Sequence, residues 1–155
     1  MERTDLIARE SIRDLLARYT WAADRGRSGE VGQCFAAGGV LEAGDHGGRW
    51  VGPAVITQEL NAVAARLTAA GEAGEGRPDP VRHHVSSVAI DLDTHAAATV
   101  RSYFLVLTSA GVDHWGRYRD QVVETAPGDK WLFQERVVIV DGRAEGSIMV
   151  PSTAS

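Results

Sequence analysis

Residues 83–125 read HHVSSVAIDLDTHAAATVRSYFLVLTSAGVDHWGRYRDQVVET, and three strand-like segments follow one another here with only short turns between them. A fourth segment comes next, after a turn that contains proline and glycine. Connections of hairpin length join antiparallel neighbours, so this part of the chain predicts an antiparallel sheet. The predicted strands are 83–92, 96–108, 113–125 and 130–141, and the turns between them are 93–95, 109–111 and 126–129.

Helical patterns come before these strands. Apolar residues at three- and four-residue steps predict a first helix that Thr4 or Asp5 caps and that ends near Asp24, before Gly26. We further expect a short helix from Ser28 to Phe35 broken at Gly38-Gly39, short antiparallel strands at 40–43 and 49–51 around a turn at 44–48, and a helix from Pro53 to about Thr68. Helices first and strands last indicate the α+β class, with a curved antiparallel sheet wrapped over the helices around a cone-shaped cavity.

The length of 155 residues suits one domain with one hydrophobic core. We expect a single domain over 1–155, with its core in 5–141 and a tail, 142–155, that is frayed or used in a subunit contact. Residues 69–80 are rich in Gly, Glu, Ala and Pro without periodicity, so we expect a loop long enough to move or to act as a lid.

Charge and hydropathy exclude several classes of partner. The net charge is -5 and the basic residues are scattered, which argues against a nucleic-acid surface. No run of residues is apolar enough to span a membrane, and the start of the chain lacks the pattern of a signal peptide, so we expect a cytoplasmic protein without a membrane partner. The excess of arginine, with abundant Ala and Gly, correlates with a bacterial GC-rich genome.

The cysteine, the lysine and three of the histidines give little indication of a nucleophile or a metal site. Cys34 is the single cysteine and lies in a short apolar stretch, so a buried inert thiol is favoured over a nucleophile. Lys130 is the single lysine and follows a turn, which argues against Schiff-base chemistry. His46, His95 and His114 fall in or beside turns, where we expect them at the surface, and nothing groups them into a metal site.

A carboxylate and an imidazole are the residue types that stand out for chemistry. Tyr19 and Asp24 close the first predicted helix, and His83-His84 open the first long strand. A carboxylate can hold imidazole in one tautomer and make it a proton acceptor near neutral pH. Strand alternation places His83 and His84 on opposite faces, so one of them can face Asp24, although a bulge would invert the pattern. The alternative interpretation gives Asp24 no catalytic role: it would be an acid at a frayed helix end, solvated or paired with Arg25 or Arg27.

Aromatic and charged residues inside the strands are candidates for lining a pocket. Tyr103 and Tyr118 carry hydroxyls that need partners when buried, and Trp50 belongs to the same aromatic set, most of which we expect in the core. Arg101 and Arg136 lie within strands, where an unpaired charge is costly. Each can bind a substrate oxygen or pair with Glu124 or Glu135, and the structural pair is the safer interpretation.

The chain resembles the SnoaL-like branch of the nuclear transport factor 2-like superfamily over roughly 5–141. The resemblance rests on Ile12-Arg13-Asp14-Leu15-Leu16 leading to Tyr19 and Asp24, Trp50-Val51-Gly52-Pro53 opening a helix, Arg82-His83-His84-Val85, and Gly116-Arg117-Tyr118 before Trp131. It implies a cone-shaped α+β barrel. The order and spacing of these motifs specify the fold better than the activity, because one fold hosts many functions.

For activity, the resemblance implies a cofactor-free lyase, dehydratase-like, or an isomerase with an Asp–His pair at the cavity floor. Asp24 and the preferred His83 would form that pair, and Tyr19 would hydrogen-bond a leaving hydroxyl or a carbonyl. The substrate would be a small hydrophobic, cyclic, oxygenated molecule, contacted by Trp50, His84, Tyr103, Tyr118, Asp120 and Arg136. No cofactor or metal is implied.

Two other functions stay open at this stage. The polyketide-cyclase branch uses an acid on a later strand, for which Asp120 is a rough match, so an aldol-type cyclase is one alternative. A non-catalytic module that binds a small ligand or takes part in assembly is the other. By resemblance, the outer face of the sheet is expected to make a homodimer or homotrimer.

Overall fold

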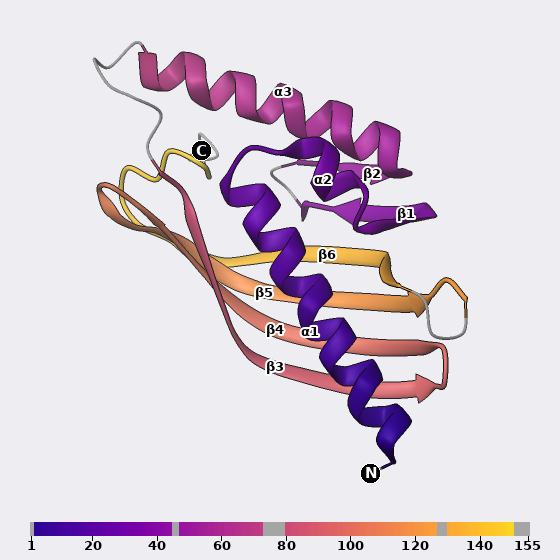
Figure 1. The fold of residues 1–155 in the computed structure, drawn as a ribbon. Helices are drawn as coiled ribbons and strands as arrows, with labels where there is room; N and C mark the ends of the chain where they lie inside the picture. Colours follow the sequence, from indigo (N-terminus) through magenta and orange to yellow (C-terminus); the bar gives the residue numbers. More distant parts are fainter. Residues whose placement is uncertain (1, 45–46, 73–79, 127–129, 151–155) are drawn as a thin grey trace.

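The computed structural model describes residues 2–44, 47–72, 80–126 and 130–150 (Figure 1). Its elements are α1 (Arg3–Asp24), α2 (Ser28–Gly32), β1 (Phe35–Glu42), β2 (Arg49–Val51), α3 (Pro53–Glu72), β3 (Arg82–Thr94), β4 (Ala97–Thr108), β5 (Gly111–Glu124) and β6 (Trp131–Arg143). The strands form one curved sheet in the order β2-β1-β6-β5-β4-β3, and α1 crosses its inner face. The predicted α+β fold is confirmed, with one difference: β1 runs parallel to β6.

Helix α1 packs the core from its apolar stripe. Ile12, Leu15, Leu16 and Tyr19 are buried against the sheet, as periodicity predicts. The predicted cap is wrong, because the helix begins earlier and Glu2 is its N-cap, with the Glu2 N–H donated to Asp5 Oδ2 at 3.2 Å. At the other end Gly26 takes the positive φ of 66° that terminates the helix.

The predicted second helix is too long, because a strand begins where it was expected to end. Helix α2 stops at Gly32, and β1 already starts at Phe35 and contains Gly38 and Gly39. The reason is a close parallel approach, since a Cβ at Gly39 would lie 2.7 Å from the Phe133 carbonyl oxygen. Glycine therefore permits strand pairing here instead of breaking a helix.

Strand β3 contains a bulge that decides which side chains face inward. Ser86 pairs with Tyr103 and Ala89 with Arg101, so Ser87 and Val88 together oppose Ser102. Ser87 has a φ of 51°, the one described non-glycine residue with positive φ. The extra residue changes the parity of the sequence, so that His83 and Val85 before the bulge share the inner face with Val88, Ile90 and Leu92 after it.

The remaining elements agree with the predicted ranges, with two differences. Helix α3 continues past Thr68 to Glu72, into the predicted loop 69–80, most of which lies outside the described residues together with the centres of the turns 44–48 and 126–129. The tail up to 150 is fastened to the domain, whereas the sequence predicts fraying or a subunit contact. Two buried clusters form the core, a large one under α1 and a smaller one around Phe104, Val106 and Tyr118.

Candidate active site

Asp24 and His83 lie in direct contact, although they are far apart in sequence. Asp24 is the last residue of α1, and its Oδ1 lies 2.6 Å from His83 Nδ1. The same carboxylate accepts the His83 backbone N–H at 3.0 and 3.3 Å. The side chains keep 9% of the Asp24 surface and 16% of the His83 surface exposed, so the pair is largely desolvated but reachable. Two attachments to one carboxylate fix both the position of β3 and the plane of the imidazole.

This contact determines which imidazole nitrogen is available for chemistry. An ionised carboxylate only accepts hydrogen bonds, so Nδ1 carries the proton that is donated to Asp24. In the neutral ring Nε2 is then the free acceptor, and the adjacent carboxylate stabilises the imidazolium that forms when Nε2 takes a proton. The arrangement can therefore act as a general base and return the proton as a general acid.

Two of the predicted substrate contacts face the wrong way. His84 is exposed next to the inward His83, as strand alternation requires. Tyr103 is 59% exposed and lies on the outer face of β4, between the buried neighbours Ser102 and Phe104. Both residues point away from Asp24, so neither belongs to the site. Trp50 packs against the larger core cluster from the edge strand β2.

Asp120 and Arg136 form a buried ion pair that the sequence does not predict. Arg136 Nε and Nη2 donate to the two carboxylate oxygens at 2.8 Å each, and the side chains are 1% exposed for Arg136 and 0% for Asp120. The predicted partners Glu124 and Glu135 are wrong because Asp120 is opposite Arg136 on the neighbouring strand and shares its inner face. Arg101 instead pairs with Asp91 on the outer face.

Aromatic rings enclose the guanidinium of Arg136. Its central carbon lies 4.2 Å from the Tyr19 ring centroid and 4.1 Å from those of Tyr118 and Phe133. Burial would lower the pKa of Arg136, but the charge of Asp120 outweighs it and raises that pKa. Burial raises the pKa of both tyrosine hydroxyls, against the opposing charge of Arg136, so Tyr19 and Tyr118 are neutral hydrogen-bond donors.

Two buried polar atoms near this cluster have no hydrogen-bond partner among the described residues. They are Arg136 Nη1 and Ser102 Oγ. Ser102 lies on the inner face of β4, opposite both the β3 bulge and Tyr118. Sequence reasoning missed it, and its signal was a small polar residue between the outward-facing Arg101 and Tyr103. Unpaired buried donors are costly, so both atoms suit an oxygen of a bound molecule or of water.

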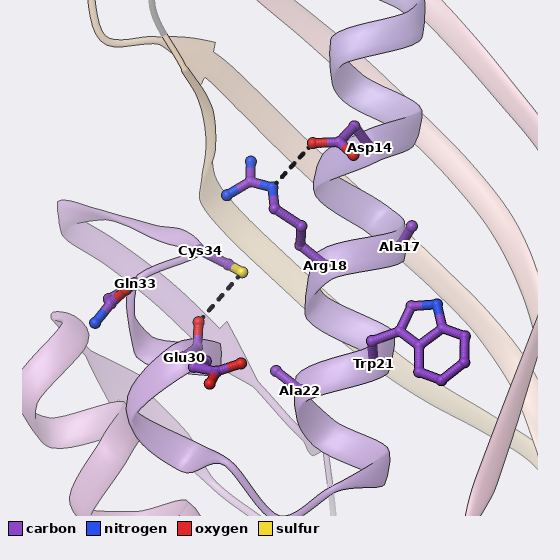
Figure 2. A pocket seen from close by; sticks show the side chains of 8 residues that line it. All are labelled: Asp14, Ala17, Arg18, Trp21, Ala22, Glu30, Gln33 and Cys34. Atoms are coloured by element: carbon purple, nitrogen blue, oxygen red, sulfur yellow. Dashed lines mark hydrogen bonds and ion pairs between the residues drawn. The ribbon is translucent and has the colours of Figure 1, made fainter.

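A separate open cavity of about 720 Å³ lies on the flank of α1 (Figure 2). Its lining is Asp14, Ala17, Arg18, Trp21, Ala22, Glu30, Gln33 and Cys34. Figure 2 shows Arg18 directed to Asp14, and the Cys34 thiol donating to the Glu30 carbonyl oxygen at 3.4 Å. Burial raises the pKa of Cys34, as expected for an unreactive thiol. Neither Asp24 nor His83 lines this cavity.

The other described histidines lie outside the Asp24–His83 pair. His95 is exposed as predicted, but His114 is buried and bonded to Asp113, which contradicts its predicted surface position; His46 lies outside the described residues. Within the described ranges, no three His, Cys, Asp or Glu side chains gather as metal ligands. No helix in the same ranges is long and apolar enough to cross a membrane.

Comparisons with known proteins agree with this fold. The family model described as the SnoaL-like domain matches residues 4–137. A structure described as a putative scytalone dehydratase from Novosphingobium aromaticivorans has a TM-score of 0.75 and 18% identity, over 100% of this chain and 99% of that one. Among curated proteins, none matches the chain.

Two further structures are also similar. A protein from Catenulispora acidiphila in complex with S-DNPA has a TM-score of 0.69 and 28% identity, over 88% of this chain and 95% of that one. ActVI-ORFA from Streptomyces coelicolor has a TM-score of 0.72 and 21% identity, over 92% and 99%. The likenesses below a quarter identity concern the fold, which is shared from end to end.

Proposed function

This chain belongs to the SnoaL-like domain family, and on that premise we propose that it is a cofactor-independent lyase of the dehydratase type, or an isomerase. The substrate is a small hydrophobic, cyclic, oxygenated molecule. The observation that carries the proposal is the 2.6 Å contact between Asp24 and His83 at a largely desolvated position. A pair of this kind has the geometry of a general base with its orienting carboxylate.

In the proposed elimination His83 Nε2 removes a proton from a carbon next to the one that carries the leaving hydroxyl. The electrons of the broken C–H bond form the double bond, and the C–O bond breaks. The imidazolium, held by Asp24, then gives its proton to the departing oxygen, so that water leaves and His83 is restored. Tyr19, whose hydroxyl is neutral, hydrogen-bonds the leaving hydroxyl or a carbonyl. General acid–base catalysis of this kind contributes about 10²–10⁴-fold.

Further features support an oxygenated substrate with a ring. Ser102 Oγ and Arg136 Nη1 are buried donors without a partner among the described residues, and the rings of Tyr19 and Tyr118 lie against the same guanidinium. The Catenulispora relative was solved with S-DNPA, which supports small-molecule binding in this family. The putative scytalone dehydratase has the same fold, which fits a dehydratase but does not specify one.

The cyclase alternative depends on Asp120, and the geometry favours the Asp–His pair over it. Both Asp120 oxygens are bound to Arg136, and the side chain has no exposed surface. Such a carboxylate has both oxygens occupied by the guanidinium and lacks a route to a substrate carbon. We therefore propose a structural role for the Asp120–Arg136 pair, with the free Arg136 Nη1 as its single contact to a bound molecule.

The proposal extends to assembly and location. The outer face of the sheet exposes Tyr103 and Trp115, which supports a homodimer or homotrimer formed through this face. A cytoplasmic location completes the proposal.

The test is a screen of hydroxylated ring compounds by thermal shift, followed by turnover of those that bind. Asp24→Asn and His83→Ala should lower turnover by about 10²–10⁴-fold. His84→Ala and Asp91→Asn are matched controls, because both residues are exposed on the outer face and should leave turnover unchanged. Unchanged turnover in both Asp24→Asn and His83→Ala would refute the mechanism. Binding without any turnover would instead favour the non-catalytic ligand-binding module.

A further inference from the structure

The segment from Ala144 to Val150 folds back after β6 and is fastened to β5 by Asp113. Asp113 Oδ2 accepts the Ser147 hydroxyl at 2.7 Å, and Oδ1 accepts the Ile148 N–H at 2.9 Å. The Asp113 carbonyl oxygen also accepts the Ala144 N–H at 2.8 Å. One residue of β5 therefore holds both ends of a turn in this segment.

A second set of contacts closes the segment on itself and on β6. Arg143 Nη1 donates to the Val150 carbonyl oxygen at 2.9 Å, and the Val150 N–H donates to Ser147 Oγ at 3.1 Å. Val150 is buried, while the neighbouring Ile148 is exposed. The hydroxyl of Ser147 thus joins Asp113 to Val150, and its removal would break two bonds at once.

The fastened segment packs on the apolar cluster that adjoins His83. Met149 packs against the smaller core cluster of Phe104, Val106 and Tyr118, as do Val81, which precedes β3, and Val85 within it. Val106 is the cross-strand partner of His83, and Val85 shares the inner face with His83. Figure 1 shows the end of the described chain turning back towards the start of β3. Met149 therefore packs on the same apolar cluster as Val106, the cross-strand neighbour of His83.

The charge of the Asp113 carboxylate strengthens the fastening. Asp113 is buried, and His114 Nδ1 lies 2.7 Å from its Oδ2. Burial alone would raise the pKa of Asp113, but the bonds from Ser147, His114 and Ile148 lower it. The carboxylate is accordingly ionised at neutral pH and a strong acceptor for the strap.

We propose that Ala144–Val150 is a closing strap of the Asp24–His83 site, in which Met149 forms a wall beside His83 and Asp113 is the positioning residue that holds the strap shut. The inference rests on the proposed function for its site. Release of the strap uncovers the apolar surface around His83 for a hydrophobic substrate, and closure shields the imidazole from bulk water. Met149 then limits the size of the ring that fits beside His83.

Histidine labelling tests this strap without any substrate. Diethyl pyrocarbonate acylates the free Nε2 of histidine, and peptide mass spectrometry gives the rate at His83 and at the exposed His84 separately. Ser147→Ala, Asp113→Asn and Met149→Ala should each raise the rate at His83 and leave the rate at His84 unchanged. The loss of both hydrogen bonds of the Ser147 hydroxyl predicts an increase of about 5- to 150-fold for Ser147→Ala.

Asp141→Asn is the matched control, because Asp141 carries an exposed pair with Arg117 and does not touch the strap. Hydrogen exchange at the Ile148 and Val150 amides reports the strap itself. Faster exchange with an unchanged His83 rate would overturn the role of the strap as a cover. Unchanged exchange in both Ser147→Ala and Asp113→Asn would overturn the role of Asp113. Neither outcome depends on turnover, so failure here is separate from failure of the Asp24–His83 mechanism.

Discussion

Replacement of Asp120 by asparagine keeps the shape of the side chain and removes its charge. Arg136 would then remain 1% exposed, enclosed by three aromatic rings, with its positive charge no longer balanced by the two 2.8 Å bonds to a carboxylate. An arginine side chain does not lose its proton in a protein, so the guanidinium cannot escape the cost by becoming neutral. Breaking a buried pair in this way typically costs about 3–5 kcal/mol. We expect Asp120→Asn to lose that much stability.

The assay is urea unfolding followed by circular dichroism, with the free energy of unfolding taken by linear extrapolation. Asp141→Asn provides a like-for-like control at the exposed pair with Arg117, where we expect a change of about 0–1 kcal/mol. In the double variant Asp120→Leu/Arg136→Met both charges are gone, and most of the loss should be recovered, since apolar replacement of a buried pair is often neutral.

The reasoning is refuted if Asp120→Asn costs no more than Asp141→Asn. That result would mean that the Arg136 guanidinium is hydrated or paired elsewhere when Asp120 is neutral. A double variant as unstable as Asp120→Asn alone would refute a narrower point. It would show that the ring contacts of Arg136, and not its charge balance, carry the stability of this cluster.

Two further outcomes follow from the core. Burial raises the pKa of Tyr118, so the contribution of its neutral hydroxyl to stability is complete below the unfolded pKa of about 10 and is lost as the pH rises above it. Tyr118→Phe should therefore flatten the fall in unfolding free energy between about pH 10 and 11. Equal slopes in the two proteins would contradict this. Gly116→Ala should lower the free energy of unfolding by about 1–3 kcal/mol, because the new Cβ would collide with the Ile139 carbonyl oxygen and lie 2.9 Å from the Phe104 ring. Gly38→Ala is the control: its Cβ would meet open space, so the same unfolding assay should show a change within about 0.5 kcal/mol.

The sequence predicts what depends on local pattern and turn chemistry. Periodicity indicated α1 and its buried face, and the turns between strands fixed the long antiparallel hairpins. Helix α2 was predicted too long because Gly38 and Gly39 are usual helix breakers, while their use here depends on the approach of β6. The approach of β6 to β1 is a tertiary contact, which leaves no signal in the local sequence.

The site was predictable in part for the same reason. The ends of α1 and β3 suggested Asp24 and a histidine, but alternation alone could not choose between His83 and His84, because the bulge at Ser87 changes the parity of β3. The Asp120–Arg136 pair depends on cross-strand register, and Asp113 binds residues of the tail. Side chains that meet across strands or through a returning tail leave no spacing rule in the sequence.

The parallel contact between β1 and β6 has a consequence for the order in which the chain can fold. Phe35 is opposite Phe133, so the hairpin of β1 and β2 acquires its neighbour in the sheet only after the last strand has emerged from the ribosome. Until then α1 and α2 have no complete surface to cover, and the edge of β1 is unpaired. Contacts of such long sequence separation slow folding and expose strand edges. The nascent chain therefore exposes an edge that favours aggregation until β6 has emerged and paired with β1.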